Sequence, residues 1–386
     1  MPPTLIQGTR STNNNSTETR RQRDVTPALS QLEPDAGPLV TMLTKLRKRG
    51  ATDPKIEWFE DQLLPRFDVL GAAITDPAAL SMTVTNYKYF RKGDLVRINK
   101  SEIVRVTTTP TSTTVAIKRG VGEAAAATAS NGAQLHILSN SNEEGAAGRS
   151  LLSTQRVPQY NYLQIIRDPW GVTNTQKGTS LFAGQDWTEE GKKQLIEHKK
   201  HIELAFLAGQ RYEDTSGSAP ERTTRGIEQW ITSNVTAIDG DLTEDLLDNF
   251  MRTCYRYGSK TKIMLGAPIV MQAINGFAKP KLRLVEKTKS YGVTLTQYEN
   301  AGRNLMLHEH NLMTNDDLND FSGLAGKAFI VDIEDLVARY MNGRFTVHNE
   351  NIQDNDVDGR EDEYLSEVGL ELHQEKFHGE LTGVQG

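Results

Sequence analysis

The 386-residue sequence contains a single cysteine, Cys254. One cysteine excludes an intrachain disulfide and a zinc site built from several cysteines, so stability has to come from packing and assembly. No apolar run approaches the roughly 20 residues that a membrane-spanning helix needs. Between Gln7 and Asp24 there is no Val, Ile, Leu, Met or aromatic residue, so the apolar segment of a signal peptide is missing there. We expect a protein kept in a reducing compartment, with no membrane partner.

Several enzyme signatures are also missing from the sequence. It has no phosphate loop, no Gly-x-Ser-x-Gly elbow, no His-Glu-x-x-His and no Cys/His ligand cluster. Because many active sites assemble from scattered residues, this lowers the weight of an enzyme interpretation without removing it. We predict no catalytic residues, no cofactor and no metal ligands.

The length favours two or three packed units, at roughly 150 residues per domain. Lys and Arg number 44 against 50 Asp and Glu, a net charge of −6, which argues against a surface that coats nucleic acid throughout. The acidity is concentrated in Glu350–Glu367, which holds eight acidic residues and one basic residue, Arg360. Such a stretch is usually solvated, so we predict an exposed acidic loop.

The acidic segment contains part of a calcium-loop pattern. Asp354, Asp356, Asp358 and Gly359 occupy its positions one, three, five and six. Position twelve, where a calcium loop has a bidentate Glu, is Leu365. The missing ligand favours a plain exposed loop over a calcium site.

Basic residues are concentrated near the N-terminus. Four lie in an arm rich in Ser, Thr and Asn that we expect to be disordered, and four more end a short helix expected around Gly37–Arg49; they are Arg10, Arg20, Arg21, Arg23, Lys45, Arg47, Lys48 and Arg49. Two interpretations stay open. One is a flexible tail and a solvated helix end, and the other is a surface that touches phosphates or a neighbouring subunit.

Short β runs rich in Thr and Val follow, with turns between them. The expected strands are Met82–Thr85, Asp94–Ile98, Glu102–Thr107, Thr113–Lys118 and Gln134–Ile137. They predict a β-meander or long hairpin. Because small hairpins are marginal in water, we expect this stretch to become ordered on a neighbouring molecule.

A glycine pattern lies inside this β region. The residues Gly120-Val121-Gly122-Glu123-Ala124-Ala125 match a dinucleotide fingerprint, and Glu143 lies at a fitting distance downstream. In that fingerprint the glycines open a helix within a βαβ unit, whereas here β patterning surrounds them. The context therefore argues against nucleotide binding.

The longest helix signal runs from Trp187 to Gly209, with Asp186 and Glu189 at its start. Its apolar stripe is thin, which suits a strut that faces solvent or another subunit. His198 and His201 are spaced i, i+3 and could bind a metal, but no third ligand is evident. We predict two surface histidines.

The segment from Gly226 to about Met313 has an α/β pattern, with a helix at Thr243–Tyr257 and a strand at Lys262–Leu265. A helix opened by Pro268 and three further strands follow, at Leu282–Glu286, Val293–Tyr298 and Asn304–His308. Cys254 lies on the apolar helix face, so we predict a packing residue and no nucleophile. His308 and His310 alternate along a strand, and we predict polar side chains on the outer face of a sheet over a metal pair.

Six stretches in this order resemble one subfamily of the tailed-bacteriophage major capsid proteins. They read DVTPALSQLEPDAGPLVTML, IEWFEDQLL, TEEGKKQLIEHKKHIELAFLAGQ, TRGIEQWI, YGVTLTQYENAGRNLMLHEHNLM and SEVGLELHQEKFHGELTGV. The resemblance implies an α+β fold, the Hong Kong-97-like capsid fold that herpesvirus capsid floors share. It divides the chain into an N-terminal arm (1–75), an extended β loop (76–145), a peripheral domain (146–225) with a spine helix (187–209), an axial α/β domain (226–313), and a closing segment (314–386) that completes the peripheral domain with C-terminal strands.

The resemblance also implies a function. It describes a major capsid protein, the self-assembling subunit of an icosahedral tailed-phage head that encloses double-stranded DNA, without catalysis or cofactor. The expected partners are copies of the same chain in hexamers and pentamers, possible scaffold, portal or decoration proteins, and packaged DNA contacted non-specifically. The expected location is the virion, with assembly in the host bacterial cytoplasm.

The founding member of the fold joins its subunits covalently through a Lys of the extended loop. Lys88, Lys92, Lys100 and Lys118 lie in or beside that loop here, but none matches the position, so we expect no crosslink. Two alternatives stay open: an intracellular α/β enzyme or nucleotide-binding protein that uses the glycines at 120–122, and another virion component such as a portal or tail protein.

Overall fold

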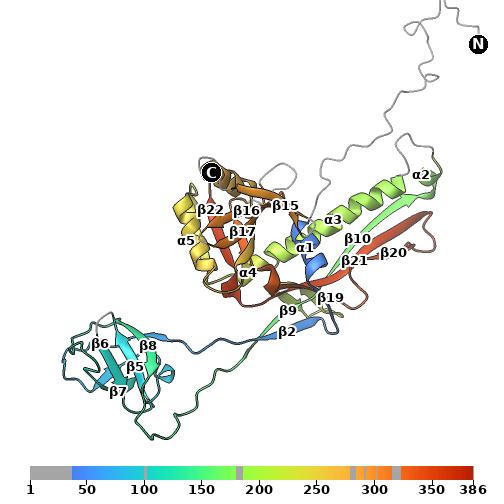
Figure 1. Ribbon diagram of the computed structural model, residues 1–386. Coiled ribbons are helices and arrows are strands. Elements are labelled where there is room, and N and C mark those ends of the chain that lie inside the picture. The colour runs from blue at the N-terminus through green and yellow to red at the C-terminus, as the bar shows by residue number, and fades with distance from the viewer. Residues whose placement is uncertain are drawn as a thin grey trace, which may run out of the picture. The chain divides into compact units, whose positions relative to one another are not determined.

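The computed structural model (Figure 1) describes residues 37–99, 102–179, 186–278, 284–290, 293–300, 302–314 and 323–385. The arginine-rich arm and Lys100 therefore lie outside the described residues. The chain forms two compact units: unit 1 comprises residues 1–57 and 160–386, and the barrel unit comprises residues 58–159. A two-stranded ladder, β2 (Lys55–Glu60) with β9 (Val157–Tyr162), lies where the chain passes from one unit to the other.

Unit 1 contains a five-stranded sheet in the order β1-β19-β21-β10, with β20 paired to β21. The strands are β1 (Lys48–Ala51), β10 (Gln164–Thr173), β19 (Leu336–Met341), β20 (Val347–Asn349) and β21 (Gly359–Leu372). The two longest, β10 and β21, are antiparallel along the whole length of β10. Helix α3 (Asp186–Ala208) packs along β10, and α2 (Asn174–Gly178) precedes it (Figure 1).

Helix α1 (Pro38–Leu46) lies against α3 and the same sheet. Proline at the first helical position suits a helix start, because its missing N–H would have no partner inside the helix. Leu39, Met42 and Leu43 share one face at i, i+3 and i+4 spacing and are fully buried. The helix predicted around residues 37–49 is confirmed in its first part, whereas its last residues form strand β1.

A mixed seven-stranded sheet forms the rest of the core of unit 1, in the order β13-β22-β18-β14-β17-β16-β15. Its strands are β13 (Val235–Gly240), β14 (Thr261–Gly266), β15 (Leu284–Ser290), β16 (Val293–Asn300), β17 (Arg303–Glu309), β18 (Ala328–Val331) and β22 (Gly379–Val384). The helices around it are α4 (Ile227–Trp230), α5 (Glu244–Cys254) and α6 (Pro268–Ala278). The small hairpin β11 (Tyr212–Asp214) and β12 (Glu221–Thr223) precedes them.

Helix α5 shows how the local sequence produces its element. The Thr243 side chain accepts a hydrogen bond from the Leu246 N–H, and acidic residues occupy the first turn, as the helix dipole favours. Leu247, Phe250 and Cys254 are buried on one face at i, i+3 and i+7. The helices predicted at residues 187–209 and 243–257 and the helix opened by Pro268 are confirmed.

The barrel unit is built from six short strands in the order β3-β8-β5-β6-β7-β4. They are β3 (Phe67–Val69), β4 (Ser81–Thr83), β5 (Asp94–Ile98), β6 (Glu102–Val106), β7 (Thr114–Lys118) and β8 (Gln134–Asn140). An antiparallel bridge between Leu70 and Val84 joins the two ends of this order, and Gly71 donates to the Thr83 carbonyl at 2.9 Å. The sheet therefore closes on itself, which removes its free edges.

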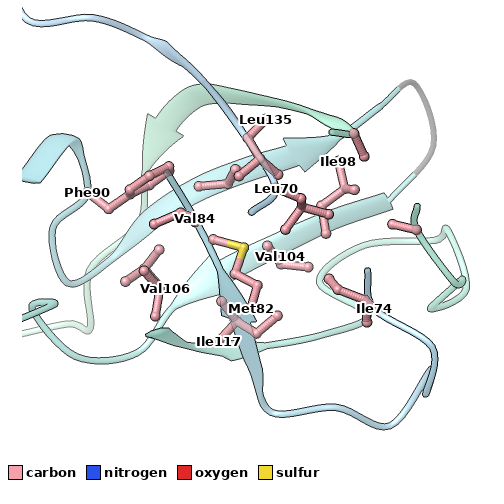
Figure 2. Close-up of a cluster of buried hydrophobic side chains, with 14 residues drawn as sticks. Leu70, Ile74, Met82, Val84, Phe90, Ile98, Val104, Val106, Ile117 and Leu135 are labelled. Atoms are coloured by element: carbon pink, nitrogen blue, oxygen red, sulfur yellow. The ribbon is translucent and has the colours of Figure 1, made fainter. Parts of the chain in front are cut away.

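The interior of the barrel is filled by 14 buried apolar residues (Figure 2). Val96, Val104 and Val115 come from three neighbouring strands and are fully buried. The strands predicted in this region are confirmed, but the expectation that the stretch lacks a core of its own is wrong. Strand β3 was not predicted, because its three residues are too few for a period of two to register in the sequence, and together with β4 it completes the barrel.

The acidic segment predicted as an exposed loop forms a loop in its first part and strand β21 from residue 359. Asp354, Asp356 and Asp358 are exposed as predicted. From residue 359 the chain enters β21, where Asp362 has no exposed surface and Glu363 is 3% exposed. This half of the prediction is wrong because counting charges within the segment does not register partners from other strands, such as Arg167 of β10 and His348 of β20, that the sheet brings to these carboxylates.

Candidate functional site

Helix α3 carries buried polar side chains where a thin apolar stripe was predicted. His198 and Glu203 have no exposed surface, although both are hydrophilic. Each lies in the register of the buried apolar residues, because His198 precedes Ile202 by four positions and Glu203 precedes Phe206 by three. This spacing was a signal in the sequence that these two side chains face the interior.

The Glu203 carboxylate caps helix α1. Its two oxygens accept hydrogen bonds from the Leu39 and Val40 backbone N–H groups at 2.8 and 2.7 Å. The first N–H groups of a helix lack partners inside it, and Gly37, at the N-cap position, has no side chain to offer. A negative charge at the positive end of the helix dipole is favourable. Glu203 thus links α1 to α3 through two hydrogen bonds.

His310 completes this junction. Its Nε2 lies 2.7 Å from Glu203 Oε1, and neither residue has exposed side-chain surface. The prediction that His310 lies on an outer sheet face is wrong: β17 ends at Glu309, and the following residue is buried against α3. One carboxylate therefore joins α1, α3 and the end of a strand of the seven-stranded sheet.

A second buried cluster links α3 to the five-stranded sheet. His198 Nδ1 lies 2.5 Å from Asp168 Oδ2 on β10, and its Nε2 lies 2.7 Å from Ser366 Oγ on β21. Burial lowers the pKa of His198, although Asp168 opposes this effect. His198 was predicted at the surface, which is wrong, whereas His201 is half exposed as predicted, and its Nδ1 lies 2.9 Å from Asp168 Oδ1.

The order Asp168–His198–Ser366 is that of a nucleophilic triad, so its access matters. Ser366 has no exposed surface, and its hydroxyl oxygen accepts the Thr346 N–H at 3.0 Å. A nearby groove of about 530 Å³ is lined by Asp168 and His201 but not by Ser366. A substrate in this groove would not reach the Ser366 hydroxyl. The cluster instead links α3, β10 and β21 through buried hydrogen bonds.

The glycine pattern lies in a loop and does not open a helix, since residues 119–133 contain none. The Glu102 carboxylate, 1% exposed, accepts hydrogen bonds from the Gly120 and Ala127 N–H groups at 3.4 and 3.2 Å and pairs with Arg119. A carboxylate of the chain itself thus takes the place that a phosphate would need. The argument from context against nucleotide binding agrees with this geometry.

The prediction that Cys254 packs in the core is confirmed, because the residue has no exposed surface and burial raises the pKa of its thiol to about 12. Within the described ranges, no three or more His, Cys, Asp or Glu residues are grouped so that they could hold a metal ion. In the same ranges, no helix is long and apolar enough to cross a membrane.

Two segments of the barrel unit expose apolar side chains without regular secondary structure. Residues 61–66 contain Leu63, which is 92% exposed, and residues 141–156 contain Leu151, which is 99% exposed. Phe59, just before the first segment, is 70% exposed. A hydrogen bond between Thr154 Oγ1 and Asp61 Oδ1 at 2.8 Å brings the two segments together.

Comparison with known proteins gives consistent results. A model of the family described as SU10 major capsid protein matches residues 6–385. The major capsid protein of Pseudomonas phage PaMx41 is 24% identical over 245 residues, which span 59% of this chain and only 57% of that protein. Among solved structures, the capsid of the native GTA particle has a TM-score of 0.53 at 8% identity and covers 98% of this chain and 100% of its own. A structure from Mycobacterium phage Bobi has a TM-score of 0.51 at 8% identity, with 96% and 97% covered. At such identities the structural likeness is one of fold.

Proposed function

Because this chain belongs to the SU10 major capsid protein family, we propose that it is the repeating structural subunit of a bacteriophage head. The family match agrees with the resemblance read from the order of six sequence stretches, and the α+β, Hong Kong-97-like fold class is confirmed. The chain therefore does not belong to a family of portal proteins, tail proteins or enzymes. The absence of catalysis remains part of the proposal.

The exposed apolar side chains of the barrel unit carry the proposal. Leu63 and Leu151 are almost completely exposed and lie in segments without regular secondary structure. Covering apolar surface from water is favourable by about 25 cal/mol for each Å². In a closed shell every copy offers the same surface to a neighbour, so a weak contact is repeated many times. We propose that neighbouring subunits cover these side chains.

The finer parts of the proposal concern partners and location. The subunits form hexamers and pentamers around packaged double-stranded DNA, which they contact non-specifically, in a virion assembled in the host bacterial cytoplasm. Scaffold, portal and decoration proteins are further partners of the same shell. The division into arm (1–75), extended loop (76–145), peripheral segments (146–225 and 314–386) and axial domain (226–313) belongs to this proposal.

Negative-stain electron microscopy of the purified protein, together with light scattering, tests the proposal. Closed shells, tubes or five- and six-membered rings are expected. A monodisperse monomer or dimer under every condition, with and without neighbouring virion proteins, would contradict it.

A double variant, L63D/L151D, tests the surface that carries the proposal. Both side chains are exposed in the single subunit, so we expect an unchanged circular dichroism spectrum and at least a tenfold loss of shells at equal concentration. The conservative variant L63M/L151M keeps the apolar surface and should assemble normally. Normal shells from L63D/L151D would show that neighbours do not cover these residues.

A further inference from the structure

Four cations form a strip at one edge of unit 1. The cationic strip consists of Lys45, Arg47, Lys48 and Arg49, and all four side chains are exposed. Among the described residues, strand β1, which contains the last two, is the edge strand of the five-stranded sheet and pairs only with β19. Four of five consecutive residues are therefore positively charged and open to solvent.

The carboxylates beside the cationic strip are bound to other arginines. Arg339, which lies opposite Arg49 in the strand pairing, is paired with Glu371. Arg344 is paired with Glu367 at 2.8 Å, and its neighbour Phe345 lies under Lys48, 5.5 Å from Nζ. Within the described part of the chain, no carboxylate lies within ion-pair distance of the strip. By contrast, Lys192 and Lys193 on α3 are paired with Glu189 and Glu190.

One further carboxylate acts on the strip from a distance. Asp335 is attracted by Arg47, but burial raises the pKa of Asp335 and so disfavours its charged form. A single carboxylate cannot balance four cations. The strip consequently repels itself in the single subunit, and an external anion would relieve this repulsion.

The charge density of the strip suits a polyanion. Double-stranded DNA carries one phosphate charge for about every 1.7 Å of its helix axis, so cations grouped within five consecutive residues can each meet a phosphate. Basic residues on an edge strand also prevent unwanted strand pairing. That role explains Lys48 and Arg49 but not Lys45 and Arg47, which precede the strand.

We propose that the cationic strip binds nucleic-acid phosphates and is a place where the subunit contacts packaged DNA. The setting inside a head rests on the proposed function, whereas the binding of phosphates by residues 45–49 is a property of the subunit itself. The competing occupant of the strip is an acidic surface of a neighbouring subunit, and the experiment separates the two.

The test measures binding of the full-length subunit to a double-stranded DNA oligonucleotide of random sequence, by fluorescence anisotropy between 50 and 200 mM salt. Each phosphate contact contributes about 0.9 to the slope of log K against log salt. The variant R47Q/K48Q/R49Q should therefore have a slope that is shallower by about 2 to 3. The matched control K192Q/K193Q/K199Q removes the same charge from exposed positions of α3 and should keep the wild-type slope.

Two more variants keep the test decisive. R47K/R49K preserves the charge and should keep the slope, and if the triple variant does not fold, K45Q and R49Q singly should each make it shallower by about 0.9. An unchanged slope in the strip variants, or no DNA binding by the wild type, overturns the proposal. Normal DNA binding with loss of shells would also overturn it, in favour of a subunit contact. If the wild type forms no shells but the slope responds as stated, the proposed function fails and the phosphate site stands.

Discussion

Buried charged and polar residues of this subunit meet partners far away in the sequence. Glu203 is 164 and 163 residues from the two N–H groups that it caps and 107 residues from His310. His198 is 168 residues from Ser366. Reading each residue by its neighbours placed both histidines at the surface, because no local pattern names a partner at such distances.

Glu203 should be among the residues on which the stability of the subunit depends most. Replacing it by Ala leaves two buried N–H groups without acceptors and His310 without its carboxylate, and breaking a buried pair of this kind costs about 3 to 5 kcal/mol. We expect E203A to lower the free energy of unfolding by that amount in urea denaturation of the unassembled subunit. E190A, at an exposed position of the same helix whose partner Lys193 is also exposed, should change it by less than about 0.5 kcal/mol. Equal effects of the two variants would refute the capping role.

His378 should make the stability depend on pH. It is buried, its Nδ1 accepts the Asp332 N–H at 3.2 Å, and burial lowers its pKa to about 4. The unfolded chain takes up this proton near pH 6.5, whereas the folded chain does so only near pH 4. The contribution of the neutral His378 to the free energy of unfolding is therefore complete above pH 6.5 and is lost as the pH falls toward 4. The full loss is about 3 kcal/mol. H378Q should unfold with a smaller pH dependence in this range; an identical dependence would exclude His378 as its source.

At the scale of elements, prediction from the sequence worked where the signal is local. The α3 stripe and the strands β5, β6 and β7 repeat their apolar residues at regular spacing, and their bounds agree with the structure to within a few residues. The three-residue strand β3 carries no such period, and it was missed. The barrel closes only because the bridge Leu70–Val84 connects the ends of β3 and β4, which no spacing rule indicates.

The barrel unit should be removable without unfolding unit 1, because each unit has a buried core of its own. Asp61 and Thr154 are joined by a 2.8 Å hydrogen bond, so a short Gly/Ser linker can replace residues 62–153. We expect the shortened chain to keep a cooperative thermal transition, and the separate fragment 58–159 to show one as well. Loss of both transitions would mean that the units fold only together. The shortened chain should form no shells, which electron microscopy would check.

At the scale of the whole molecule, the order of segments along the chain was readable from the sequence, but the pairing of distant segments was not. The resemblance was carried by the joint order of six stretches, none of which is a chemical signature, and the family match bears it out. The strand order inside the seven-stranded sheet could not be read in the same way. Strands β18 and β22 come from the segment predicted to close the chain, yet they lie between β13 and β14.

That strand order has a consequence for synthesis on the ribosome. Within the part of the chain that the structure describes, strand β13 pairs only with β22, which follows it by about 140 residues. Until translation has passed Val384, β13 has no partner and one edge of β18 stays open. Domains generally fold from the N-terminal side as they emerge, so the barrel unit can close early while this sheet waits. The seven-stranded sheet of unit 1 is thus completed only in the last stage of translation, after the barrel unit has emerged.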